Sequence, residues 1–189
     1  MLSNDLYFLG AAYYPDYLPS RSRVPEENGA EAFLSPEEMI ERDVSRMTKC
    51  GVNVVRMGEF SWSFVERKRD HLDFSRFLFA LDRLYETGIK VVFCTPTATP
   101  PKWLIDQFPD ILPVQRNGQR IPFGSRRHYD PSHPAYRQES ERITEIYAKA
   151  FGQHPAVFAW QIDNEFGCHG SAFQFSDHAL REFRGWLSE

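Results

Sequence analysis

The stretch V-F-A-W-Q-I-D-N-E-F-G, Val157 to Gly167, runs from apolar residues into two acids and an amide. Its first six residues, Val157–Ile162, have the length and composition of a buried strand. Asp163, Asn164 and Glu165 then follow where that strand should end. Chemistry in parallel α/β folds collects at the carboxyl ends of strands, so this stretch bears on both the fold and the function.

The rest of the chain repeats the alternation of strand and helix. Apolar runs predict three earlier strands, at Leu6–Tyr14, Val52–Met57 and Ile89–Cys94. Amphipathic stretches between start and stop signals predict four long helices, between Ser35 and Gly51, Asp73 and Gly88, Pro134 and Gly152, and Ser176 and Leu187. A short helix at Trp103–Gln107 and a long loop at Pro109–Arg127 complete the pattern. The order β-α-β-α-β-α-β-α predicts parallel βαβ units in one domain, residues 1–189.

Composition narrows the classes of function. The 189 residues carry a net charge of -4, which makes nucleic acid a poor partner. Three widely spaced cysteines do not form a disulfide framework and fit a reducing compartment. The N-terminus has no basic segment typical of a signal peptide, and no apolar run is long enough to span a bilayer. We therefore expect a cytoplasmic protein that does not enter a membrane.

Polar residues follow all four predicted strands. The first three groups are Tyr13–Asp16, Arg56 with Glu59, and the threonines of Thr95–Thr99. Arg56 and Glu59 could form a structural ion pair, which we favour slightly over direct catalysis. The carboxyl ends of parallel strands share one edge of a sheet, so we expect the groups to converge there.

Glu165 is the strongest catalytic candidate among these residues. A carboxyl group beside an apolar strand is partly desolvated, which raises its pKa and suits it to general acid catalysis. Asn164 could donate a hydrogen bond to a substrate hydroxyl, whereas Asp163 is expected to be structural. The alternative is that D-N-E is only a solvated turn or helix cap. Arg126 and Arg127 could be solvated loop residues, or one of them could bind a sugar hydroxyl or orient a carboxylate.

Five segments together resemble the N-terminal half of the catalytic barrel of glycoside hydrolase family 42 β-galactosidases. They are A-A-Y-Y-P, V-N-V-V-R-M-G-E-F-S-W, T-P-T-A-T-P-P-K-W-L, G-S-R-R-H-Y-D-P and W-Q-I-D-N-E-F-G. The resemblance implies a (β/α)8 TIM barrel, of which this chain covers about the first four βα units, and a retaining β-galactosidase. It implies that Glu165 is the acid/base and that Asn164 and Arg126 bind the substrate. It also implies a homotrimeric full-length enzyme, and we expect no cofactor.

Two departures from the family pattern matter. Some members bind zinc through four cysteines, and the matching positions here hold Asp130, Gln174, Ser176 and Ala179. Thiolates set the affinity of such a site, so we predict no metal there. The second departure is length, because a TIM barrel typically takes about 250 residues. The family's nucleophile follows the seventh strand, about 5–5.5 Å from the acid/base, and this chain does not reach that strand.

Two alternatives stay open at this point. The chain could belong to another clan-related retaining β-glycosidase, such as an arabinopyranosidase, or it could be a non-catalytic sugar-binding half-barrel. The Asn164–Glu165 pair argues against the second alternative. We also expect the 189-residue chain alone to be inactive and prone to aggregate, because half a barrel leaves strand edges and apolar helix faces uncovered.

Overall fold

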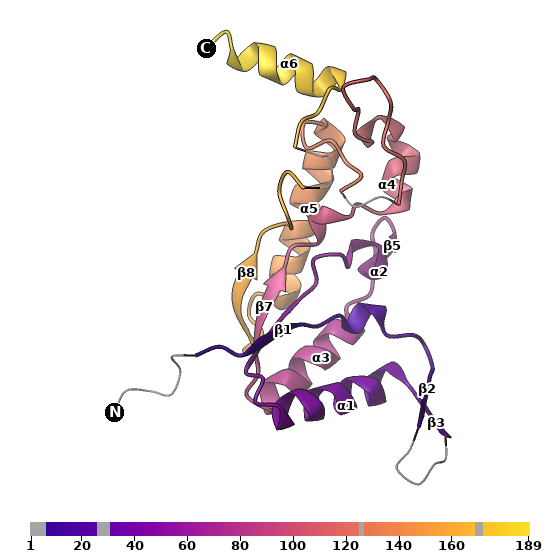
Figure 1. Ribbon diagram of the computed structural model, residues 1–189, viewed down its shortest axis with the longest axis vertical. Coiled ribbons are helices and arrows are strands. Elements are labelled where there is room, and N and C mark those ends of the chain that lie inside the picture. The colour runs from indigo at the N-terminus through magenta and orange to yellow at the C-terminus, as the bar shows by residue number, and fades with distance from the viewer. Residues whose placement is uncertain (1–6, 26–30, 125–126, 169–171) are drawn as a thin grey trace. The chain divides into compact units, whose positions relative to one another are not determined.

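The computed structural model describes residues 7–25, 31–124, 127–168 and 172–189 (Figure 1). They fall into two compact units. Unit 1 comprises Met1–Gly58, Asp73–Cys94 and Ala150–Gln161, and unit 2 comprises Glu59–Leu72, Thr95–Lys149 and Ile162–Glu189. The single domain expected over residues 1–189 stays a prediction.

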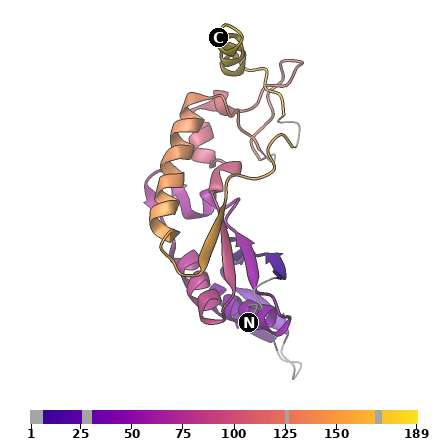
Figure 2. The ribbon, with the colours of Figure 1, turned by 90° about the vertical axis from the view of Figure 1, so that its left-hand side faces the viewer.

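Unit 1 is built on a parallel four-stranded sheet. Its strands are β1 (Gly10–Ala12), β4 (Val54–Met57), β7 (Lys90–Cys94) and β8 (Val157–Gln161), in the order β1-β4-β7-β8. Figure 2 shows β7 and β8 side by side, with Phe93 opposite Trp160 in register. Strand order follows chain order, as in the first four strands of a (β/α)8 barrel, so the predicted parallel sheet is confirmed.

The first strand is shorter than the predicted Leu6–Tyr14. The Leu9 N–H donates to Asn53 Oδ1 at 2.9 Å, and Asn53 Nδ2 donates to the Tyr7 carbonyl at 2.9 Å. An asparagine side chain therefore takes hydrogen bonds that a neighbouring strand would otherwise make. After the strand, Pro15 begins a 3-10 turn, Pro15–Tyr17. The strand β1 has three residues, and backbone hydrogen bonds flank it, from the Asn53 N–H to the Leu9 carbonyl at 3.0 Å and from the Tyr13 N–H to the Arg56 carbonyl at 2.9 Å.

Two amphipathic helices pack beside each other in unit 1, α1 (Pro36–Lys49) and α3 (Ser75–Glu86). The start of α1 is a capping box: Ser35 Oγ accepts from the Glu38 N–H at 3.2 Å, and Glu38 Oε2 accepts from the Ser35 N–H at 2.7 Å. Ile40 and Val44 of α1 are buried, as the helical spacing predicts.

An aromatic cluster forms part of the core of unit 1. The Phe93 ring of β7 stacks on the Phe151 ring at 4.4 Å and meets the edge of Phe77 from α3 at 5.4 Å. All three side chains are fully buried. Trp160 of β8 lies 5.7 Å from Phe93 between ring centroids. Strands β7 and β8 are therefore held by ring packing as well as by their backbone ladder.

Five short elements were not predicted. They are β2 (Ser22–Pro25) paired with β3 (Glu31–Leu34), the helix α2 (Trp62–Val65), and β5 (Glu66–Lys68) paired with β6 (His71–Leu72). Segments of two to four residues are too short to show a hydrophobic period, so sequence patterns do not reveal them.

Unit 2 is mostly helix and turn. It contains two 3-10 turns, Pro96–Ala98 and Pro109–Ile111, with α4 (Lys102–Gln107) and α6 (Asp177–Trp186), and it holds most of α5 (Pro134–Phe151). The predicted long loop is therefore interrupted, by one of these turns and by a bridge between Val114 and Arg120. None of the helices in the described segments is long and apolar enough to cross a membrane.

Candidate active site

Asp163 is the centre of a buried polar cluster in unit 2. Only 5% of the residue is exposed. Its carboxylate accepts hydrogen bonds from Thr97 Oγ1 at 2.7 Å, from Arg127 Nη1 at 2.8 Å and from the Tyr129 hydroxyl at 3.1 Å. Its own N–H donates to Thr95 Oγ1 at 2.7 Å. A buried carboxylate is tolerated when charge and hydrogen bonds compensate it, and Asp163 has both. This agrees with the expected structural role.

Arg127 supplies the positive charge and is itself 6% exposed. Besides Asp163, its guanidinium donates to the Asn164 carbonyl and to the Tyr129 hydroxyl. The guanidinium carbon lies 5.5 Å from the centroid of the Phe166 ring. Arg127 of R-R-H-Y thus orients a carboxylate. Arg126, predicted to bind substrate, lies outside the described residues.

The polar groups after two neighbouring strands meet here, as the sequence predicts for strand ends. Thr95 and Thr97 follow β7, and Asp163 follows β8. Tyr136 of α5 donates to the Thr97 carbonyl at 3.1 Å, and its ring stacks on Tyr129 at 4.1 Å. On the sheet of unit 1, Arg56 Nη1 donates to Gln161 Oε1 at 3.1 Å.

The negative charge of Asp163 contributes to raised pKa values of both tyrosines, Tyr129 and Tyr136. Burial, followed by the nearby Asp163 carboxylate, raises the pKa of Tyr129 far above its ordinary value. Burial also raises the pKa of Tyr136, with smaller contributions from Tyr129 and Asp163. Both hydroxyls therefore keep their protons at any physiological pH and act as donors.

The backbone of the D-N-E turn is unusual. Asp163 has φ 54° and Glu165 has φ 51°, both in the left-handed region. L-residues other than glycine, asparagine and aspartate occupy this region at a cost. Asn164, between them, is half-buried, and its N–H donates to Asp163 Oδ1 at 2.6 Å. Such backbone outliers cluster at functional sites, where surrounding contacts hold them.

The Glu165 side chain is exposed. The burial expected from a neighbouring apolar strand is therefore not supplied by the described part of the chain. Phe166, immediately after it, is exposed too. Glu165 begins a turn in which the Cys168 N–H donates to its carbonyl at 3.1 Å.

A cavity of about 270 Å³ lies beside the turn. Tyr129, Tyr136 and Phe166 give it aromatic walls, and Arg127 and Asp163 give it a polar wall. The remaining lining residues are Pro131, Gly167 and Ala172. Aromatic walls with a few fixed polar groups are typical of small-molecule sites.

Two of the four positions where the family pattern has cysteines are bonded to each other. Ser176 Oγ donates to Asp130 Oδ2, and it accepts from the Ala179 N–H at 3.0 Å as the N-cap of α6. Asp130 is fully buried. These side chains serve as a hydrogen bond and a helix cap, and a hydroxyl and a methyl group are poor substitutes for zinc thiolates. The absence of zinc at these positions stays a prediction.

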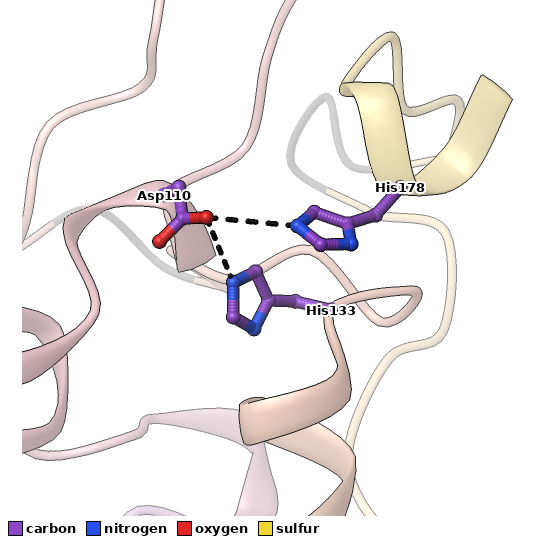
Figure 3. A group of neighbouring side chains, drawn as sticks. All are labelled: Asp110, His133 and His178. Atoms are coloured by element: carbon purple, nitrogen blue, oxygen red, sulfur yellow. Dashed lines mark ion pairs between the residues drawn. The ribbon is translucent and has the colours of Figure 1, made fainter. Parts of the chain in front are cut away.

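A second cluster joins Asp110, His133 and His178 (Figure 3). The Nε2 atoms of His133 and His178 lie 3.2 Å and 3.5 Å from Asp110 Oδ2. Partial burial raises the pKa of Asp110, but hydrogen bonding, first from His133, outweighs it and the pKa falls below its usual value. The three residues could in principle hold a metal ion.

The other ring nitrogens oppose metal binding. His133 Nδ1 accepts from the Ala135 N–H at 3.2 Å, and the Arg181 guanidinium lies 2.9 Å from His178 Nδ1. Arginine only donates, so both Nδ1 atoms accept and the ring protons lie on Nε2. A metal ion would need the Nε2 lone pairs. The cluster therefore joins α6 to the start of α5 and to the Pro109–Ile111 turn by hydrogen bonds.

The parallel sheet in chain order, with polar residues after its strands and an Asn-Glu pair after the fourth, defines the class of (β/α)8-barrel glycosidases. The family model Glyco_hydro_42, described as beta-galactosidase, matches residues 32–189. The chain therefore belongs to glycoside hydrolase family 42.

Curated and solved relatives agree with this assignment. The chain is 42% identical over 179 residues to Beta-galactosidase BgaA of Thermus sp, covering 95% of this chain and 25% of that protein. The structure of the beta-galactosidase from the psychrophilic Marinomonas ef1 matches with a TM-score of 0.83 at 38% identity, over 96% of this chain and 25% of that one. The beta-galactosidase of Halorubrum lacusprofundi matches with a TM-score of 0.84 at 39% identity, again over 96% and 25%. The chain thus spans about a quarter of the length of these relatives.

Proposed function

We propose that the full-length protein carrying these residues is a retaining β-galactosidase that hydrolyses terminal non-reducing β-D-galactose residues. The observation that supports this most is the Asn164–Glu165 pair directly after β8, in a chain that matches the family over residues 32–189. Relatives that cover this chain almost completely are named beta-galactosidase.

In this proposal Glu165 protonates the leaving oxygen of the glycosidic bond and later deprotonates the attacking water. Asn164 donates a hydrogen bond to a sugar hydroxyl, and Arg126 binds the same sugar. The nucleophilic carboxylate belongs to a part of the barrel outside this chain. Glu165 is exposed within the described residues, so the burial that would tune it must come from the rest of the barrel and from the substrate.

The remaining expectations are part of the same proposal. The substrate is a β-galactoside, and the enzyme needs no cofactor. It acts in the cytoplasm as a homotrimer, without a nucleic-acid or membrane partner. The acidic net charge of -4 supports the exclusion of nucleic acid, and the scattered cysteines support the cytoplasm.

Substitution of Glu165 by glutamine in the full-length protein tests the assignment. Lactose, whose leaving group needs a proton, should be hydrolysed at least about 100-fold more slowly, within the range for loss of general acid catalysis. A dinitrophenyl galactoside releases dinitrophenolate, a stable anion that needs no proton. The glycosyl-transfer step, in which the glycosyl-enzyme forms, should therefore be much less affected with this substrate. Wild-type rates on lactose for the folded variant would show that Glu165 is not the acid/base.

The alternative that the sequence leaves open is a related β-glycosidase, such as an arabinopyranosidase. Initial rates on nitrophenyl β-galactoside and nitrophenyl α-L-arabinopyranoside, compared as kcat/KM, separate the two. Galactose carries a hydroxymethyl group that arabinopyranose lacks, so a pocket built for it should favour the galactoside by at least about ten-fold.

A further inference from the structure

We propose that the buried Arg127–Asp163 ion pair is a positioning device for Glu165. It fixes the backbone of Asn164, and through it the direction in which the Glu165 side chain leaves the turn. This inference rests on the proposed function, because it assumes that Glu165 is the acid/base. It adds two residues to which the family resemblance assigned no role in the reaction.

Hydrogen bonds hold both the backbone and the side chain of Asp163 in place. Its N–H is held by Thr95 Oγ1 at 2.7 Å and its carboxylate by Thr97 Oγ1 at 2.7 Å. Both threonines follow β7, so the backbone and the side chain of Asp163 are hydrogen-bonded to the same short segment. Tyr129 adds contacts to both carboxylate oxygens at 3.2 Å and 3.1 Å.

The pair then holds both polar groups of the Asn164 backbone. Asp163 Oδ1 accepts from the Asn164 N–H at 2.6 Å, and Arg127 donates to the Asn164 carbonyl. The carbonyl belongs to the peptide unit that leads directly into Glu165. With the peptide units on both sides of Asn164 held, the N and Cα atoms of Glu165 are placed. The Cys168 N–H donates to the Glu165 carbonyl at 3.1 Å, which restrains the remaining rotation that directs the Glu165 Cα–Cβ bond.

The turn needs such restraint because its conformation is unfavourable without it. Residues on both sides of Asn164 have positive φ, at 54° and 51°. Aspartate tolerates the left-handed region better than glutamate does, so Glu165 would relax to another conformation if its neighbours released it. A general acid must stay within hydrogen-bonding reach of the oxygen it protonates, and a displacement of about 1 Å can cost on the order of 100-fold in rate.

The test uses the full-length protein with Asp163→Asn, which keeps the side-chain shape and removes the charge. We expect lactose hydrolysis to fall by about 100-fold, while the glycosyl-transfer step with a dinitrophenyl galactoside changes by less than about ten-fold. A role limited to folding would lower both rates equally, because it would reduce the amount of active enzyme. The exposed Arg137–Glu182 pair supplies the control: Glu182→Gln makes the same chemical change and should leave both rates unchanged.

Asp163→Asn leaves Arg127 buried without its counter-charge, and this could prevent folding. A second variant, Arg127→Lys, avoids the difficulty because it keeps a positive charge for Asp163. A single ammonium group cannot copy the planar fork that reaches Asp163, Asn164 and Tyr129 together. We expect the same preferential loss on lactose in a folded protein.

The outcomes separate this inference from the proposed function. If Glu165→Gln shows the leaving-group dependence and the folded Asp163 and Arg127 variants do not, the positioning role is wrong and the catalytic assignment stands. If Glu165→Gln itself keeps wild-type activity on lactose, the proposed function fails first. An equal loss on both substrates in Arg127→Lys, with unchanged stability, would also overturn the positioning role.

Discussion

Glu66 shows how much one buried charge depends on its partners. The residue is fully buried in unit 2. Its carboxylate accepts from Trp62 Nε1, from the Asp70 N–H and from Arg142 Nη2, each at 2.8 Å. Arg142 is the only one of these three donors that carries a charge. Removing it would leave Glu66 with two uncharged donors, and it would also break the ion pair between Arg142 and Glu139 at 2.6 Å.

We therefore expect Arg142→Met to lower the free energy of unfolding by roughly 3–5 kcal/mol. Methionine fills much of the same volume, so the loss reports on the charge rather than on a cavity. Denaturant unfolding of the full-length protein, followed by the fluorescence of its tryptophans, measures the change. A loss below about 1 kcal/mol would mean that water reaches Glu66 in the folded protein.

Arg137→Met is the matched control at this scale. Arg137 pairs with Glu182, but both side chains are about half exposed. Solvent screens such a pair, and its contribution should lie between about 0 and 1 kcal/mol. Arg142 also pairs with Glu139 and Asp70, so the difference between the two substitutions reports the combined effect of burial and of additional ion pairs.

At the scale of elements, Gly58 shows why β4 ends where it does. Its φ is 102°, and a Cβ there would lie 3.0 Å from Phe93 Cε1 and 3.2 Å from the Cys94 carbonyl oxygen. Both neighbours belong to β7, whose Phe93 is fixed in the aromatic core. The position thus needs glycine for its backbone angle and for its space.

Gly58→Ala should therefore destabilise the protein by more than about 1 kcal/mol. Gly51, after α1, has φ 76°, and an added methyl group there would meet nothing within 4 Å, so Gly51→Ala carries the conformational cost alone. Thermal unfolding of both variants separates the two contributions. Equal losses would show that the β7 side accommodates the methyl group at no cost.

Local patterns predicted the main elements well because their physical causes are local. The capping box of α1 and the apolar stripe of α3 follow from residues three or four apart. The hydrogen bonds before the first strand do not, because they involve Asn53, which lies 44 residues after Leu9 in the chain. The hairpin β2–β3 and the turn elements in unit 2 are likewise too short to carry a period.

The candidate site was predictable in position but not in detail. The rule that chemistry follows strand ends predicted Asn164 and Glu165. It also grouped Thr95 and Thr97 with them, but it gave the threonines no partner. The contact between Arg127 and Asp163 joins residues 36 apart, and no spacing in the sequence encodes it. The sequence showed the basic pair in R-R-H-Y and the acid Asp163 after the fourth strand as two separate features.

At the scale of the whole molecule, surfaces that a complete barrel would cover are open. A hollow of about 350 Å³ lies over β1 and β4 on the sheet of unit 1, where barrel interiors are normally filled by side chains. In unit 2, α6 has no buried residue, although its Phe183 and Trp186 are large and apolar, and Leu187, its C-cap, is exposed as well. Exposed apolar surface of this kind drives association.

We expect the 189-residue chain, produced alone, to hydrolyse no nitrophenyl galactoside and to self-associate. Light scattering after size-exclusion chromatography should show species larger than a monomer. Replacing Phe183 and Trp186 by glutamate should reduce their proportion, while Arg184→Glu, on the same helix, serves as the control for added charge. A stable, active monomer would contradict both parts of the expectation.

The left-handed backbone at Glu165 has a consequence for engineering. Glycine would adopt that angle without strain, so Glu165→Gly should raise thermal stability while removing the side chain proposed to be the acid/base. A library screened for heat resistance alone should therefore drift away from glutamate there, and a library screened for turnover should retain it. The two selections would diverge at this single position, as expected if stability is given up there for the proposed catalytic role.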